Sequence, residues 1–174
     1  NEIFLARTKG IGTISGEDAI AFGVTGPALR ASGVLEDVRI SEPYSIYDRF
    51  DFDVPIGLDG DCWDRYYVRV QECYESISMI LQCLDQMREG DIMVQGRRIA
   101  RPPAGQVYVH SENPRGDMAV YLVSDGSDKP YRVKVRAPSF ANLQAMRHLL
   151  RDAYVADVVI VLGSIDIVLG EVDR

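Results

Sequence analysis

Residues 61–88, DCWDRYYVRVQECYESISMILQCLDQMR, carry the clearest secondary-structure signal in the chain. Apolar residues recur there at intervals of three and four, which is the spacing of one face of an α-helix. This apolar stripe consists of Trp63, Tyr66, Val70, Cys73, Ile77, Ile80, Leu84 and Met87. Asp61 is a suitable N-cap and Gly90 a suitable terminator, so the sequence predicts a long amphipathic helix over about 62–88.

The charged side chains of this helix mostly fall off the apolar stripe. They are Arg65, Arg69, Glu72, Glu75, Asp85 and Arg88. We expect them to form a solvated face, although in an assembly the same charges could instead meet a neighbouring chain.

All three cysteines, Cys62, Cys73 and Cys83, lie on the predicted helix. Consecutive cysteines are separated by about 15 Å along its axis, so no pair can share a disulfide or a metal ion. We interpret them as small apolar residues in a reduced compartment.

Toward the amino terminus, two short helices are predicted. Ser15 and Asp18 fit a capping box, which indicates a helix start. Gly26-Pro27 places proline at a first helical position, and Gly33 is a good stop for that second helix. From Glu42 to Gly60 no period persists, so this stretch is expected to cross the molecule as ordered, irregular chain. The aromatic residues expected to anchor it are Tyr44, Tyr47, Phe50 and Phe52.

Toward the carboxy terminus, the pattern changes to β-strands. Residues 106–111, 118–124 and 131–136 alternate or are rich in β-formers, and turn sequences at 113–116 and 125–126 separate them. The sequence therefore predicts a three-stranded antiparallel meander.

The last 36 residues are predicted to contain a helix and a buried segment. The helix begins at Ser139 or Asn142 and continues through Leu150, and the run from Val155 to Leu162 is a buried strand or the end of a buried helix. Together with the earlier elements this gives an α+β fold, mainly helical over 1–104, with the meander, a helix and a terminal tail over 105–174.

Composition excludes several classes of function. The 174 residues carry a net charge of -7, which disfavours binding to nucleic acid. The longest apolar run is far shorter than the roughly 20 residues needed to cross a bilayer. P-loop, dinucleotide-binding and nucleophile-elbow motifs are absent from the sequence, and neither His110 nor His148 has a partner at metal-ligand spacing. The chain begins Asn1-Glu2 with no visible leader, so we expect a fragment of a longer protein.

Short motifs spread over nearly the whole chain resemble one family. They are Arg7-Thr8, Gly10-Ile11-Gly12, Gly26-Pro27, Leu29-Arg30-Ala31-Ser32-Gly33, Pro43-Tyr44, Gly60-Asp61, Asp64-Arg65-Tyr66, Glu112-Asn113-Pro114-Arg115-Gly116, Tyr121-Leu122-Val123-Ser124-Asp125-Gly126, Pro130-Tyr131-Arg132, Arg136-Ala137-Pro138-Ser139-Phe140 and Gly163-Ser164-Ile165-Asp166-Ile167-Val168-Leu169-Gly170-Glu171-Val172-Asp173-Arg174. In this order they resemble the carboxy-terminal part of the 49-kDa component, also called the D component, of proton-pumping NADH:quinone oxidoreductase (respiratory complex I). In chloroplasts the corresponding protein is called the H component.

This resemblance implies a fold and a function. The fold would be like that of the [NiFe] hydrogenase large subunit, with residues 1–174 forming a single carboxy-terminal fragment that ends in a buried tail. The parent enzyme would pass electrons from a terminal iron-sulfur cluster to quinone and couple this transfer to proton translocation. The fragment alone would be inactive, since the family's quinone-headgroup histidine and tyrosine lie in its amino-terminal half.

The resemblance also places the site. Aligned with the hydrogenase ending, Val168 and Glu171 stand where two cysteines would hold nickel and iron, so hydrogenase activity is disfavoured. In complex I the corresponding cavity takes quinone, which needs an apolar pocket with a few acids and donors. The residues assigned to this pocket and the nearby cluster are Asp166, Val168, Glu171 and Arg174.

Three further residues are possible supports of the pocket. Arg115 would brace it by pairing with a carboxylate such as Glu112, or would form a plain salt bridge in its turn. Asp173 would take part in function or in a terminal salt bridge.

The resemblance implies that the chain binds no metal or other cofactor directly. Quinone would be the substrate of the parent complex, NAD would bind elsewhere in the complex, and the iron-sulfur cluster would belong to a neighbouring small subunit. Other expected partners are the 30-kDa component, also called the C component, and the rest of complex I, with no nucleic acid. The expected location is peripheral, on the cytoplasmic face of the inner membrane, or on the matrix or stroma side in an organelle.

Two alternatives remain open at the level of sequence. The chain could be a stand-alone interaction or assembly domain that has kept only the fold. It could also be a subunit of a related energy-converting, hydrogenase-like complex.

Overall fold

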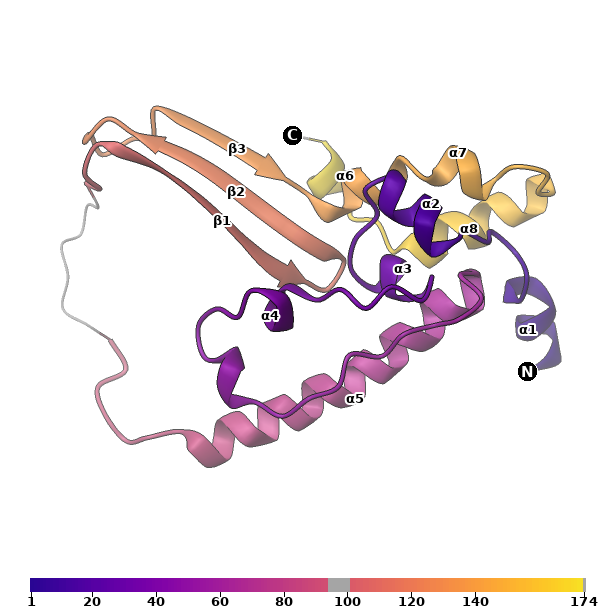
Figure 1. The fold of residues 1–174 in the computed structure, drawn as a ribbon, viewed down its shortest axis with the longest axis horizontal. Helices are drawn as coiled ribbons and strands as arrows, with labels where there is room; N and C mark the ends of the chain where they lie inside the picture. Colours follow the sequence, from indigo (N-terminus) through magenta and orange to yellow (C-terminus); the bar gives the residue numbers. More distant parts are fainter. Residues whose placement is uncertain (94–100, 174) are drawn as a thin grey trace.

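The computed structural model describes residues 1–93 and 101–173 and has an α+β architecture. The helical half contains α1 (Glu2–Thr8), α2 (Gly16–Ala21), α3 (Pro27–Arg30), α4 (Val38–Ser41), the 3-10 turn η1 (Tyr47–Arg49) and α5 (Cys62–Gln86). The second half contains β1 (Gly105–Asn113), β2 (Gly116–Ser124), β3 (Arg132–Arg136), α6 (Pro138–Leu143), α7 (Met146–Leu149), the 3-10 turn η2 (Val155–Asp157), α8 (Val158–Ile165) and α9 (Leu169–Val172). The sheet and the far half of α5 project from one helical cluster (Figure 1).

Helix α5 confirms the long helix predicted over about 62–88. It has 25 residues, and the Asp61 side chain caps it by accepting a hydrogen bond from the Asp64 amide at 2.8 Å. Over the described residues, no helix combines the length and the apolar character required to span a bilayer.

The predicted faces of α5 are wrong in both halves of the helix. In the first half the buried residues are Cys62, Asp64, Arg65 and Val68, and in the second half most of the predicted apolar stripe is exposed. Tyr66, Ile77, Ile80, Leu84 and Met87 are each more than half exposed. The start of α5 packs on α3 and α8, and its arginines are buried there because they donate hydrogen bonds to backbone carbonyl oxygens. The far half of α5 extends away from this contact (Figure 1).

The cysteine prediction is confirmed in its geometry and only partly in its environment. Cys62, Cys73 and Cys83 all lie on α5 as free thiols. Of the three, Cys62 is buried, because it lies at the start of α5 within the hydrophobic core, and Cys73 and Cys83 are exposed.

The two short amino-terminal helices begin where predicted. Ser15 caps α2, with its hydroxyl oxygen accepting from the Asp18 amide at 3.1 Å and its hydroxyl donating to the Asp18 carboxylate at 2.8 Å. Pro27 opens α3, and Gly33 takes a φ of 81° just beyond its end. Residues 42–60 contain η1 but no longer element, as expected for the irregular crossing.

The predicted meander is confirmed. Its strand order is β1-β2-β3, with Asn113 opposite Gly116 at the tight turn and Ala119 opposite Arg136. Gly26 and Gly116 meet where this turn contacts the start of α3: a Cβ built on Gly26 would lie 2.3 Å from the Gly116 Cα. Both residues have positive φ, so glycine is required here for space and for conformation.

The carboxy-terminal predictions are partly corrected. The single helix predicted from Ser139 or Asn142 to Leu150 is divided into two helices, α6 and α7. Residues 155–162, predicted as a strand or the end of a helix, are helical. Val155 and Val159 are exposed, so this run is not uniformly buried. The tail after Ile165 is half-buried to exposed. The expected buried tail is therefore wrong for the described residues, because α9 lies at the surface of the helical cluster (Figure 1).

The core lies where the two halves of the chain meet. Its buried residues are Ile14, Ala19, Val24, Ala28, Leu29, Cys62, Ala145, Leu149, Val161 and Ile165. Because they come from both ends of the sequence, the amino-terminal helices and the carboxy-terminal helices fold as one body and fix the tail relative to α5.

Candidate functional site

The carboxy-terminal end of α8 is held by three arginines. Arg65 Nε donates to Ser164 Oγ at 2.9 Å, and Arg69 donates to the carbonyl oxygens of Ser164 at 2.7 Å and Ile165 at 3.0 Å. Arg115 Nε donates to the Asp166 carbonyl oxygen at 3.0 Å. The last carbonyls of a helix lack partners within it and carry partial negative charge, so these guanidinium groups satisfy the end of α8 and fix where the tail leaves it.

Asp166 lies directly beside this arginine clamp. Its φ of 57° reverses the chain after α8, and its carboxylate lies 3.6 Å from Arg115 and 4.0 Å from Arg69 Nε. The Arg69 Nε–H is buried and has no hydrogen-bond partner within residues 1–93 and 101–173. The site therefore sets one carboxylate between two cations, neither at close hydrogen-bond distance.

Ser139 anchors the next part of the tail. Its hydroxyl donates to the Glu171 carboxylate at 2.5 Å and accepts from the Val168 amide at 3.2 Å, and its own amide also donates to Glu171. Ser139 is buried near the start of α6, whose first residue is Pro138. This contact fixes Val168 and Glu171, two of the residues assigned to the site from sequence.

Two different cavities receive the predicted site residues. Asp166 and Glu112 line a cavity of about 350 Å³, together with Arg30, Arg69 and Glu72. Glu171 lines a second cavity of about 680 Å³ between α2, β3, α6 and α9. The structure thus brings Asp166 and Glu112 together and places Glu171 apart from them. Asp173 is exposed beyond α9, and Arg174 lies outside the described residues.

Arg115 pairs with a carboxylate as predicted, but this carboxylate is that of Asp166, 3.6 Å away, and not that of Glu112. Arg115 lies in the two-residue turn after β1 and reaches back to Asp166, while Glu112 lies on β1 and binds Arg30 at 2.8 Å. A salt bridge confined to the turn is also excluded by these partners, because both side chains contact other elements.

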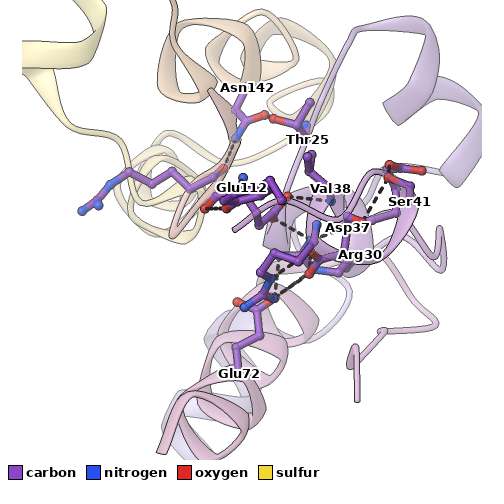
Figure 2. Close-up of polar contacts among 12 residues, drawn as sticks. Thr25, Arg30, Asp37, Val38, Ser41, Glu72, Glu112 and Asn142 are labelled. Carbon is purple, nitrogen blue, oxygen red and sulfur yellow. Dashed lines mark hydrogen bonds and ion pairs between the residues drawn. The ribbon is translucent and has the colours of Figure 1, made fainter. Parts of the chain in front are cut away.

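A buried ionic cluster surrounds Arg30, whose side chain is 2% exposed. Its guanidinium lies 2.7 Å from Glu72 on α5, 2.8 Å from Glu112 on β1 and 3.6 Å from Asp37 at the start of α4 (Figure 2). Arg39 pairs with Asp37 through two nitrogens, at 2.6 and 2.9 Å. We call these five residues the Arg30 cluster.

The three carboxyls of the cluster have different environments. Burial raises the pKa of Glu72 and Glu112 even though both contact Arg30. Burial acts the same way on Asp37, but the hydrogen bonds and charge of Arg39, with the charge of Arg30, outweigh it and lower the Asp37 pKa. The two glutamates are therefore the carboxyls that most readily hold a proton.

Sequence reasoning missed most of the Arg30 cluster and also the contacts of two arginines of α5 with the end of α8. Arg65, Arg69 and Glu72 were assigned to a solvated face, which is wrong because they face α3 and α8. Their spacing of four and three residues places them on one side of the helix, and this spacing could have indicated a shared contact with another element. Arg30 offered another signal, since it is a single cation within an otherwise small and apolar motif.

His110 has two carboxylate neighbours, which its position in the sequence did not indicate. Its Nδ1 lies 3.1 Å from Asp117 on β2 and its Nε2 lies 3.1 Å from Glu42. The contact with Glu42, followed by that with Asp117, raises the His110 pKa despite partial burial. Groups of three or more His, Cys, Asp or Glu suited to hold a metal ion are not found in the described ranges.

Comparison with known proteins relates the whole chain to one family. Residues 1–104 and 97–174 match the family described as "Respiratory-chain NADH dehydrogenase, 49 Kd subunit". The chain is 49% identical over 174 residues to the D component of NADH-quinone oxidoreductase from Clostridium beijerinckii and 50% identical over 173 residues to that from Carboxydothermus hydrogenoformans. It is 51% identical over 173 residues to the same component from Desulforamulus reducens.

These alignments cover 99 to 100% of this chain and 47% of each relative. The chain therefore spans about half the length of the curated relatives it matches. The assignment to their carboxy-terminal part stays a prediction from the motifs.

Proposed function

Because the chain belongs to the family of the 49-kDa subunit of respiratory-chain NADH dehydrogenase, we propose that it is part of the quinone-binding catalytic subunit of an NADH:quinone oxidoreductase. Its role there is to shape the site at which electrons pass from an iron-sulfur cluster to quinone, in a reaction coupled to proton translocation. The match over the whole chain is the observation that carries this proposal.

The fixed position of the tail supports the assignment of Asp166, Val168 and Glu171 to the quinone site, with Asp166 and Glu171 lining different cavities. A two-electron, two-proton substrate needs acids held at fixed positions beside apolar surface. Arg115 and Arg69 hold the end of α8 beside Asp166, and Ser139 holds both Val168 and Glu171. In this proposal Asp166 and Glu171 supply or orient protons from two sides of the tail, and Val168 contacts the quinone ring or its chain.

The partners follow from the same family. The iron-sulfur cluster belongs to a neighbouring small subunit, the 30-kDa component and the other proteins of complex I pack around the chain, and NAD binds elsewhere. We propose a peripheral location on the cytoplasmic face of the inner membrane, or on the matrix or stroma side in an organelle. Arg174 is proposed to lie near the cluster, where its charge would raise the cluster's potential.

The fold is proposed to be related to the large subunit of [NiFe] hydrogenases, with the metal site lost. Val168 has no lone pair to offer a metal, and Glu171 is hydrogen-bonded to Ser139. Metal analysis of the purified protein tests this: we expect no stoichiometric nickel, and bound nickel would instead favour a hydrogenase-like complex.

Site variants in the assembled complex test the proposed role. Asp166→Asn and Glu171→Gln keep side-chain size and remove the proton-accepting charge, so we expect NADH oxidation by quinone to fall about a hundredfold. Oxidation of NADH by a water-soluble artificial acceptor, which bypasses quinone, should be unchanged. The matched control is Asp128→Asn in the exposed loop after β2. Full quinone activity in both tail variants would refute the assignment.

Isolation of the native protein with its partners separates this function from that of a stand-alone domain. Recovery with the cluster-bearing small subunit supports the enzyme. Recovery as a free chain of 19.4 kDa would instead indicate a stand-alone interaction domain.

A further inference from the structure

Within its five residues the Arg30 cluster contains one more acid than it has cations, and Arg69 is a further cation beside Glu72. Asp37, Glu72 and Glu112 supply three carboxyls, whereas Arg30 and Arg39 supply two guanidinium groups. Arg39 is committed to Asp37 through two short contacts, so Glu72 and Glu112 share Arg30. The side chains of Arg30, Asp37 and Glu112 are 2, 1 and 6% exposed, so solvent compensates an excess negative charge there only weakly, and chiefly at Glu72, which is 18% exposed.

The cluster is joined to Asp166 through Arg69. Asp166, Arg69, Glu72, Arg30 and Glu112 all line the same 350 Å³ cavity. Arg69 lies 4.0 Å from Asp166, and it interacts electrostatically with both Asp166 and Glu72. A change of charge at Asp166 therefore alters how strongly Arg69 compensates Glu72.

We propose that Glu72 and Glu112 together hold one exchangeable proton beside Arg30, and that Arg69 couples this proton to the charge of Asp166. The inference deepens the proposed function, because Asp166 is one of the residues assigned to the quinone site. The proton exchanges with solvent through the cavity. The Glu72 side chain lines this cavity and is 18% exposed. Binding it converts one carboxylate to a carboxylic acid, and no electron transfer is involved.

The groups facing the glutamates determine the direction of the coupling. Among the described residues they are Arg30 on α3, Asp37 and Arg39 at α4, Tyr44 and Tyr47 before and within η1, Arg69 and Cys73 on α5, and Asp166 after α8, beside which Arg115 lies. If Asp166 becomes neutral, Arg69 has more uncompensated charge to offer Glu72. The shared proton is then bound less tightly and leaves at a lower pH.

Infrared spectroscopy of the purified complex, without NADH or quinone, tests the proposal. We expect a carbonyl stretch of a protonated carboxyl, identified by its shift in D₂O, that persists to a higher pH than that of an exposed glutamate. Both Glu72→Gln and Glu112→Gln should lose this band, because either change leaves as many cations as carboxylates. Glu36→Gln, which alters a nearby acid on the surface, should keep the band. Retention of the band in either of the first two variants would overturn the shared proton.

A titration of the same band in Asp166→Asn tests the coupling without altering the cluster. We expect its midpoint to move to lower pH than in the unmodified protein. An unchanged midpoint, or one moved to higher pH, would overturn the coupling through Arg69. Because this measurement needs no turnover, it can fail while the quinone assignment holds, and it can succeed while quinone activity proves independent of the tail.

Discussion

Arg65 demonstrates, at the scale of one residue, how a cation can belong to a protein core. It is 1% exposed, and burial lowers its pKa. Its nitrogens donate to the carbonyl oxygens of Gly12 and Gly60, to Ser164 Oγ and to Cys62 Sγ, at 2.7 to 3.3 Å. One guanidinium thereby links the amino-terminal segment, the start of α5 and the end of α8.

Replacement of Arg65 should be strongly destabilising. Arg65→Met fills similar volume but leaves buried acceptors unsatisfied, so we expect a loss of about 3 kcal/mol or more in the free energy of unfolding. Denaturant unfolding of the purified protein measures it. Arg49→Met, at an exposed position in η1, should change stability by about 0.5 kcal/mol or less. A loss at Arg65 no larger than this would refute its structural role.

His110 predicts a pH dependence of stability. Its contacts with Glu42 and Asp117 raise its pKa, so the folded state favours the protonated ring. The stabilisation is fully present below the ordinary histidine value of about 6.5 and is lost as the pH rises through the raised folded value. His110→Gln should therefore be less stable than the unmodified protein at about pH 6, and this difference should shrink as the pH rises through the raised folded value. A difference that grows with pH would contradict the assigned contacts.

At the scale of the element, local signals were enough to place most helices and strands. Asp61, Ser15 and Pro27 begin helices for capping reasons that act within a few residues, and the meander follows from alternation and turn chemistry. The burial of α5 could not be read this way. Which face of a helix is buried depends on its partners, and the contacts of Arg65 and Arg69 with the end of α8 join residues 95 to 99 positions apart.

The contact between the β1–β2 turn and α3 predicts a sharp contrast between two glycines. A Cβ at Gly116 would lie 2.4 Å from Thr25 Oγ1, and its φ is 133°. We expect Gly116→Ala to cost about 2 kcal/mol or more, because the turn must move away from α3. Gly105→Ala, at a β1 position with no neighbour within 4 Å, is the matched control. Thermal unfolding compares them, and equal midpoints would contradict the close approach.

At the scale of the whole molecule, the site was predictable only through the family resemblance. The motifs pointed to Asp166, Val168 and Glu171, and the structure holds all three through side chains of other elements. Long-range placement was not available from sequence: Arg30 meets Glu112 across 82 residues. The separation of Asp166 and Glu171 into two cavities likewise depends on how α6, α8 and α9 pack.

The exposed apolar face of α5 predicts self-association of the 174-residue chain when it is produced alone. Ile77, Ile80, Leu81 and Leu84 are 55 to 58% exposed on consecutive turns of α5, and Met87, just after the helix, is 69% exposed. The double variant Ile80→Glu, Leu84→Glu should reduce association, as measured by sedimentation velocity. A control pair, Leu35→Glu and Leu58→Glu, changes exposed leucines elsewhere. A monodisperse monomer before any substitution would contradict the expectation.

The most direct test of the central claim is photolabelling of the native complex with a photoreactive quinone, followed by mass spectrometry. We predict label within residues 164–173, around Val168, that disappears when excess unlabelled quinone is present. Competed label found only on other proteins of the complex, with this segment unmodified, would contradict the placement of the tail at the quinone site.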